Sequence, residues 1–128
     1  MLTLGCAGLL PLPPGGWRAD ALIWSGLRWS VRHGGPRAGP GAMLWDGGPA
    51  GVWVEADGRL RLTAGRRGGR WTGAEVAAEL PAGSLGAAVC LDDPRRIDDA
   101  FVAGVFLYRD DRHELDVEVS RWGRPDRR

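Results

Sequence analysis

Three acidic residues alternate along the segment His113–Val119, which reads H-E-L-D-V-E-V. In an extended strand, side chains two residues apart point to the same face, so Glu114, Asp116 and Glu118 share one face. Like charges in such a row cannot all ionise easily, and at least one carboxyl pKa rises. A carboxyl group with a raised pKa suits general acid catalysis, and an ionised partner suits nucleophilic attack. The row therefore indicates the paired carboxylates of glycoside hydrolysis.

The spacing of the outer pair fits one form of that reaction. The α-carbons of Glu114 and Glu118 lie about 13 Å apart in a strand that rises about 3.3 Å per residue. A retaining glycosidase needs its two carboxyl groups about 5–5.5 Å apart. Glutamate side chains that lean toward each other over Asp116 close much of that gap, and a concave sheet closes more. We expect a retaining site, and the alternative is a solvated strand face without chemistry.

The elements around the acidic row predict how it is held. The apolar run Val102–Tyr108 and the tight turn Arg109–Asp111 precede it, which indicates a hairpin. The face opposite the acids is apolar, and we expect it to form core between two sheets. The acidic strand is therefore predicted to be central. The apolar residues of that face are Leu115, Val117 and Val119.

Short β-type segments separated by turn residues dominate the rest of the chain, and no helical pattern of useful length occurs. Asp57-Gly58 is a two-residue hairpin signal. Seven or eight strands at this spacing predict an all-β fold, namely an antiparallel β-sandwich or jelly roll. The other expected strands are Leu27–Arg32, Gly51–Glu55, Arg59–Thr63, Trp71–Leu80 and Gly86–Leu91.

Length, charge and cysteine content limit the kinds of partner that the chain is expected to bind. The chain has 128 residues, enough for one domain with a modest core. Its net charge of +1 gives no field that would favour nucleic acid or a membrane surface. No stretch is long enough to span a bilayer. Cys6 and Cys90 form no metal-binding spacing, so we expect no metal and no cofactor. Cys90 lies in an apolar run and is predicted to be a buried thiol.

The acidic strand and its surroundings resemble a known family. Glu114–Glu118 (E-L-D-V-E) is similar to the E-[ILV]-D-x-E signature of glycoside hydrolase family 16, and Val119–Gly123 resembles the F-S-R-W-G that follows it in a bacterial subgroup. Upstream, Val105–Asp111 is similar to the hairpin that leads into the signature. Val52–Leu62 and Trp71–Val76 resemble two further strands of the family. The similarity runs from about Trp24 to Pro125.

The resemblance implies a concanavalin A-like jelly roll and a retaining, endo-acting hydrolase of β-1,3 or β-1,4 linked glucans or galactans. It implies that Glu114 is the nucleophile, Asp116 the assisting acid and Glu118 the acid/base. It also implies a secreted protein with a polysaccharide or oligosaccharide partner, although no clear signal peptide is visible. The specific glycan and the oligomeric state stay open.

The chain also departs from the family pattern. Family domains are longer, and the signature is normally followed by several more strands. We therefore expect 23–128 to be a truncated family 16-like domain, incomplete at its C-terminus, and 1–22 to be an uncertain N-terminal segment with a possible signal remnant. We therefore expect little hydrolase activity from this short chain alone. The alternative to a hydrolase is a non-catalytic carbohydrate-binding sandwich or an inactive fragment.

Four further side chains are candidates for substrate binding. Trp122 follows the acidic strand and could stack on a sugar ring or pack on the sheet edge. Arg121 could pair with the carboxylates or lie on the surface. Trp71 and Trp45 are weaker candidates for sugar stacking, because tryptophan is more often core in a small sandwich.

Overall fold

The computed structural model describes residues 2–6, 16–35, 41–81, 86, 88–93, 95 and 98–124. Every named element is a β-strand, so the fold class is all-β, as predicted. No helix in the described ranges has the length and apolarity needed to cross a membrane. The strands are β1 (Leu2–Cys6), β2 (Trp17–Trp24), β3 (Leu27–Arg32), β4 (Leu44–Trp45), β5 (Val52–Val54), β6 (Leu60–Leu62), β7 (Gly65–Arg67), β8 (Arg70–Gly73), β9 (Val76–Ala77), β10 (Glu79–Leu80), β11 (Val102–Asp110) and β12 (His113–Ser120).

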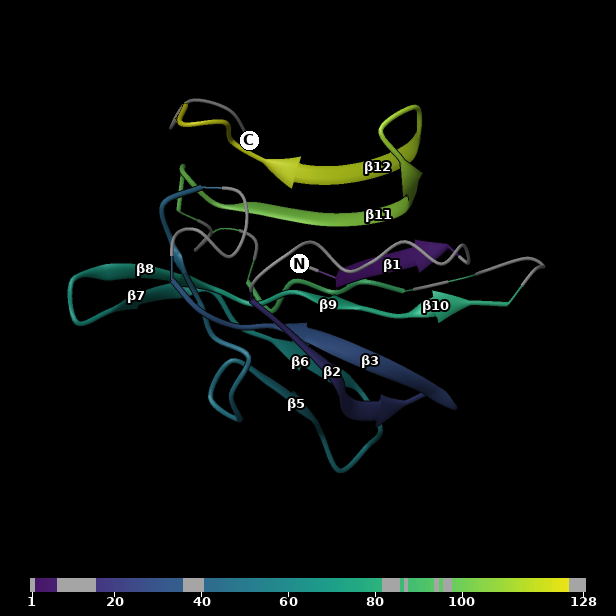
Figure 1. Ribbon diagram of the computed structural model, residues 1–128. Coiled ribbons are helices and arrows are strands. Elements are labelled where there is room, and N and C mark those ends of the chain that lie inside the picture. The colour runs from purple at the N-terminus through teal and green to yellow at the C-terminus, as the bar shows by residue number, and fades with distance from the viewer. Residues whose placement is uncertain are drawn as a thin grey trace.

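The largest sheet has the order β10-β1-β11-β12. β1 is parallel to both of its neighbours, and β11 and β12 form an antiparallel hairpin. A second sheet has the order β2-β3-β9. In Figure 1 the β11–β12 hairpin lies at the opposite side of the molecule from β5 and β2.

The second sheet begins with a tight hairpin. Ser25 and Gly26 both have positive φ angles, 50° and 74°, and they join β2 to β3 where Trp24 pairs with Leu27. Two consecutive residues with positive φ match the right-handed twist of the strands they connect. β3 then continues for six residues between β2 and β9. The predicted strand Leu27–Arg32 is therefore confirmed.

The hydrophobic core lies against β3. Trp29 and Val31 project from the same face of this strand and are each 1% exposed. Burial of a large apolar side chain contributes about 1.5–3 kcal/mol. Trp29 also donates a hydrogen bond of 3.0 Å from Nε1 to the carbonyl oxygen of Trp24. The other buried members of this core are Val52, Ala74, Val76, Ala78 and Leu80.

Two small sheets complete the described fold. β5 and β6 form a hairpin around Asp57-Gly58, as predicted, and Leu60 and Leu62 pack against the core. β4, β8 and β7 form the other sheet. The predicted strand Trp71–Leu80 is divided among β8, β9 and β10.

A buried ion pair stands beside the core. Arg32 and Glu75 are 8% and 1% exposed, and the guanidinium contacts both carboxylate oxygens of Glu75. The guanidinium also lies 4.5 Å from the ring centre of Trp17 and 4.9 Å from that of Trp45. Two stacked indoles and a carboxylate compensate for the loss of water around a buried charge.

Two sequence predictions about burial are wrong. The acidic strand is not central: β12 is the last strand of its sheet, and in the described chain it pairs only with β11. Its apolar face is not core, since Leu115 is 64%, Val117 65% and Val119 51% exposed. Their cross-strand partners on β11 pack against the core, so the core ends beneath β11 and β12 extends past it.

Two further predictions about the segment before β11 are also wrong. The described residues of Gly86–Leu91 form no strand, and Cys90 is an exposed free thiol.

At the other end of the chain, β2 runs across the predicted boundary between 22 and 23, and β1 belongs to the largest sheet. Residues 7–15 and 125–128, which include parts of the predicted segments, lie outside the described residues.

Candidate functional site

The hairpin β11–β12 places an aromatic strip beside the acidic row. The antiparallel register pairs Glu114 with Tyr108 and Asp116 with Phe106. Directly opposed residues of an antiparallel pair project to the same face, with β-carbons about 4.5–5.5 Å apart. The carboxylates and the two aromatic rings therefore share one face of the sheet. Figure 1 shows the two strands side by side along their whole length.

The third carboxylate faces a glycine. Glu118 pairs with Gly104, and a β-carbon at Gly104 would lie 3.6 Å from Cγ of Glu118. That distance is ordinary van der Waals contact, so Gly104 leaves the Glu118 side chain room without being indispensable. The face thus carries two aromatic rings at one end and, at the other, a buried glycine in contact distance of Glu118.

The turn between the strands is held by its own acidic residues. Asp110 accepts a hydrogen bond of 3.0 Å from the backbone N–H of Arg112, and its carboxylate lies 2.7 Å from Nδ1 of His113. These contacts lower the pKa of Asp110, the imidazole contact most. The hydroxyl of Tyr108 donates to Asp111 over 2.8 Å, and this bond is the main reason that the pKa of Tyr108 is raised. The turn therefore fixes the ring of Tyr108 beside Glu114.

The pKa of Glu114 is raised above its ordinary value. Partial desolvation raises its pKa, and the charge of Asp116 and a hydrogen bond with it raise it further. Asp111 and Glu118 add smaller repulsions in the same direction. The direction of the shift agrees with the prediction that one carboxyl pKa of the row is raised, but its largest cause is desolvation and the crowding of like charges comes second. The affected group is Glu114, which the family resemblance makes the nucleophile, whereas a raised pKa is the property that suits a general acid.

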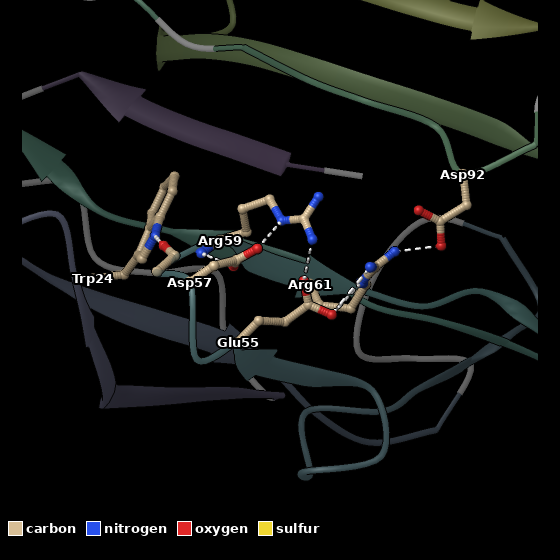
Figure 2. A network of polar contacts seen from close by, with 7 residues as sticks. Trp24, Glu55, Asp57, Arg59, Arg61 and Asp92 are labelled. Carbon is tan, nitrogen blue, oxygen red and sulfur yellow. Dashed lines mark hydrogen bonds and ion pairs between the residues drawn. The ribbon is translucent and has the colours of Figure 1, made fainter.

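A second cluster of carboxylates, on and near the β5–β6 hairpin, differs from the acidic row because its acids pair with arginines. On the β5–β6 hairpin, Arg61 bonds to Glu55 at 3.0 Å and also contacts Asp92, and Arg59 pairs with Asp57 at 2.8 Å (Figure 2). The contact with Arg61 lowers the pKa of Asp92. Every acid of that cluster forms an ion pair with one or both of two arginines, Arg59 and Arg61.

No arginine within the described ranges forms an ion pair with the acidic row. Glu114, Asp116 and Glu118 are all exposed. Nor do these acids form part of a metal-binding group, since no set of three or more His, Cys, Asp or Glu side chains in the described chain is arranged to hold an ion. The row is an open, anionic surface rather than a structural network.

Trp122 and Arg121 adjoin the row in sequence but differ in their contacts. Trp122 is 58% exposed and has a positive φ of 52°. Its backbone N–H donates to Oγ of Ser120 over 3.0 Å. Arg121 binds Asp99 at 3.1 Å instead of the carboxylates of the row. Trp122 therefore keeps a ring face available for stacking, whereas Arg121 anchors the end of β12 to the preceding loop.

The other two tryptophans lie elsewhere. Trp45 is 3% exposed and packs on Arg32, so it presents no open ring face to a sugar. Trp71 is half-buried on β8, with the guanidinium of Arg66 4.7 Å from its ring centre. A hollow in the surface is lined by residues such as Arg18, Leu22 and Trp53, and none of its lining residues is acidic.

The sequence analysis missed Phe106 and Tyr108 as site residues. The sequence predicts a strand that contains both residues, and the structure adds that they lie opposite Asp116 and Glu114. The signal was present, because a hairpin around Arg109–Asp111 with a short turn forces the aromatic strand and the acidic strand into register. Alternation along Val102–Tyr108 then places both rings on the face of the carboxylates.

Neither the models of known protein families, nor the curated proteins, nor the solved structures gave a match to this chain. The resemblance to glycoside hydrolase family 16 therefore stays a prediction from the motif and its neighbours. The geometry of the β11–β12 face is the basis for assigning a function.

Proposed function

We propose that this chain carries the catalytic strand of a retaining glycoside hydrolase that cleaves β-1,3 or β-1,4 linked glucans or galactans within the polysaccharide. The observation that carries the proposal is the row of three carboxylates on β12, which pairs with no arginine of the described ranges and lies beside aromatic rings on β11. The proposal includes a concanavalin A-like jelly roll as the finer description of the all-β architecture.

The first step forms a covalent intermediate. The ionised carboxylate of Glu114 attacks the anomeric carbon of the sugar, and the glycosidic carbon–oxygen bond breaks. Glu118 gives its proton to the leaving oxygen, so the released chain carries a neutral hydroxyl group. The product is a glycosyl ester on Glu114. The raised pKa of Glu114 sets the lower pH limit of this step, because only the ionised form attacks.

The second step releases the sugar. The carboxylate of Glu118 takes a proton from a water molecule, whose oxygen attacks the anomeric carbon. The ester bond to Glu114 breaks and its carboxylate is restored. Two displacements return the starting anomeric configuration. Asp116 stands between the two glutamates and its charge raises the pKa of Glu114, so its role is to tune the protonation of that group.

The aromatic side chains supply the surface on which a sugar ring can rest. Phe106 and Tyr108 are each partly exposed on the face of the carboxylates, and Trp122 lies just past Glu118 in the chain. Pyranose rings have apolar C–H faces that pack on aromatic rings. A polysaccharide that crosses β11 and β12 would meet the rings of Phe106 and Tyr108 beside the acidic row.

A non-catalytic carbohydrate-binding role is the second candidate, and one observation favours it. All three carboxylates are exposed, and the hollow described above does not lie over them. General acid catalysis and electrostatic stabilisation are strongest where water is excluded. An open face with aromatic rings can bind a glycan without cleaving it.

The test is reducing-sugar release from laminarin, lichenan and agarose by the purified chain. We expect release from at least one glycan and a loss of about a hundredfold or more in Glu114→Gln and in Glu118→Gln. Glu79→Gln is the matched control, because Glu79 is an exposed glutamate on β10 of the same sheet. It should leave the rate unchanged.

Two outcomes separate the candidates. Equal rates for the wild-type chain and Glu114→Gln would rule out catalysis by the row. Glycan binding without turnover, weakened by Phe106→Ala or Tyr108→Ala, would favour the binding role. The anomeric configuration of the first product, read by proton NMR, checks the retaining mechanism.

A further inference from the structure

The edge of the largest sheet is long and open. β12 spans eight residues, and within the described chain its only partner is β11. The outer side of an edge strand presents unpaired N–H and C=O groups, which can bond to another extended segment. Proteins commonly protect such an edge by keeping it short, by a proline or by a covering element. β12 contains no proline.

The apolar side of this edge is exposed as well. Leu115, Val117 and Val119 project from one face of β12, and each is more than half exposed. Their neighbours on β11, including Val105 and Leu107, pack against the core. The apolar surface of the core thus continues outward onto β12 and ends uncovered at the edge. An added strand with aliphatic side chains on this face would extend the packed layer.

The other face of the same strand is anionic. Glu114, Asp116 and Glu118 are exposed and have no arginine partner within the described ranges. In a sheet, residues directly opposite on neighbouring strands interact, and opposite charges stabilise the pair while like charges destabilise it. An added strand would therefore be favoured by cationic side chains on this face.

A second copy of the chain does not meet these requirements. Antiparallel pairing of two β12 strands about a two-fold axis at Asp116 places Glu114 of one copy opposite Glu118 of the other. Six carboxylates would then gather on one face, with like charges opposite each other. The acidic row therefore disfavours self-pairing while it leaves a cationic partner favourable.

We propose that the β12 edge docks an extended polypeptide segment in which cationic and aliphatic residues alternate, and that this segment adds to the sheet as a neighbouring strand. The aliphatic residues cover Leu115, Val117 and Val119, and the cationic residues face the carboxylates. Backbone hydrogen bonds provide affinity, and the two faces provide the specificity of the alternating pattern. The inference does not rest on the proposed glycosidase activity.

The experiment titrates the intact chain with a fluorescein-labelled peptide of alternating lysine and valine, followed by fluorescence anisotropy. Two control peptides use glutamate in place of lysine, or the same residues in separate blocks of lysine and valine. We expect the alternating cationic peptide to bind about tenfold or more tightly than either control. Amide hydrogen exchange should slow along Leu115–Val119 when it binds.

Matched variants identify the edge as the site. Val117→Lys should weaken binding about tenfold or more, because it puts a charge on the apolar face. Val54→Lys is the control, since Val54 is also an exposed valine on a strand and lies on β5. A peptide N-methylated at alternate residues needs no change in the protein and should fail to bind if backbone pairing is required.

Several results would overturn the proposal. Equal binding of the block peptide or of the N-methylated peptide would show ionic attraction without strand addition. Binding unchanged by Val117→Lys would place the contact elsewhere. A wild-type chain that sediments as a dimer, and becomes a monomer in Val117→Lys, would show that a second copy occupies the edge instead.

Discussion

β3 and β12 have similar patterns of alternating side chains but opposite surroundings. Both place three apolar residues on one face and only polar residues on the other, three on β3 and four on β12. β3 lies between two strands, and its Trp29 and Val31 are almost completely buried. β12 has one described neighbour, and its apolar residues are all exposed. Alternation thus determines which way a side chain points, and the neighbouring elements determine whether it is buried.

The same contrast applies to the charged residues. Arg32 at the end of β3 is buried, bonded to Glu75 and stacked between two indoles. The carboxylates of β12 are exposed and repel one another. One strand therefore uses its charges to stabilise the fold, and the other holds charges that are free to act on a ligand. Four predictions test this contrast between the buried and the exposed parts of the molecule, and the one with the largest expected effect on stability comes first.

Arg32→Met should destabilise the chain most. Removing one partner of a buried ion pair leaves the other charge uncompensated, at a cost of about 3–5 kcal/mol. Arg28→Met on the same strand is the control, because Arg28 is exposed and should change stability by about 0.5 kcal/mol or less. Urea denaturation followed by circular dichroism measures both. Similar midpoints for the two variants would contradict the structural role of Arg32.

Gly51→Ala should also strongly destabilise the folded chain. A methyl group on Gly51 would overlap the carbonyl oxygen of Asp46, which is backbone and cannot move aside easily. Overpacking of this kind costs about 1–3 kcal/mol or more. Gly104→Ala on β11 meets only ordinary contacts with Glu118 and should not destabilise the chain, because alanine inside a strand is favoured over glycine by about 0.5–1 kcal/mol. Thermal melts of both variants rank them, and the reverse order would refute the comparison.

Val31→Ala and Val117→Ala remove the same atoms from the two regions. Val31 is 1% exposed, and losing its two methyl groups should cost about 2 kcal/mol. Val117 is 65% exposed, so its loss should cost about 0.5 kcal/mol or less. The free energies of unfolding come from urea titrations of each variant. An equal loss at both positions would mean that the apolar face of β12 is covered in solution.

Glu114→Gln should have the smallest effect on stability, and its sign should be positive. The pKa of Glu114 is raised in the folded chain, so the folded state holds this proton more tightly than the unfolded state does. The free energy of unfolding therefore falls as pH rises from the ordinary glutamate pKa through the raised one. The variant should be slightly more stable than wild type at neutral pH.

The gain from Glu114→Gln should vanish in acid, where Glu114 is protonated in both states. Denaturation of the wild-type chain and of the variant at a series of pH values checks this. A gain that persists at low pH would have to come from packing rather than from charge.

Local features of the fold were predictable from the sequence. The alternation of Leu27–Arg32 predicted β3, Asp57-Gly58 predicted a hairpin, and the turn before His113 predicted the pairing of β11 with β12. Such features depend on residues close together in the chain, whose steric preferences act without tertiary contacts. The acidic row itself was also visible, because alternation alone places its members on one face.

Burial was less predictable, because it depends on which strands become neighbours. Nothing local to Leu115 or Val117 indicates that the core ends beneath β11. Cys90 was assigned to the core from its apolar neighbours, but it is exposed because Gly86–Leu91 does not enter a sheet in the described residues. The pairing of Arg32 with Glu75 joins residues 43 positions apart and has no local signal.

The indole pair beside the core gives the fold an optical signature. Trp24 and Trp29 have ring centres 5.4 Å apart and planes tilted by 52°. Two identical chromophores held so close and at an angle couple their electronic transitions, which splits the circular dichroism band into a couplet of opposite signs. The couplet arises only while the β2–β3 hairpin fixes both rings. Its amplitude therefore reports the integrity of the second sheet separately from the state of β12.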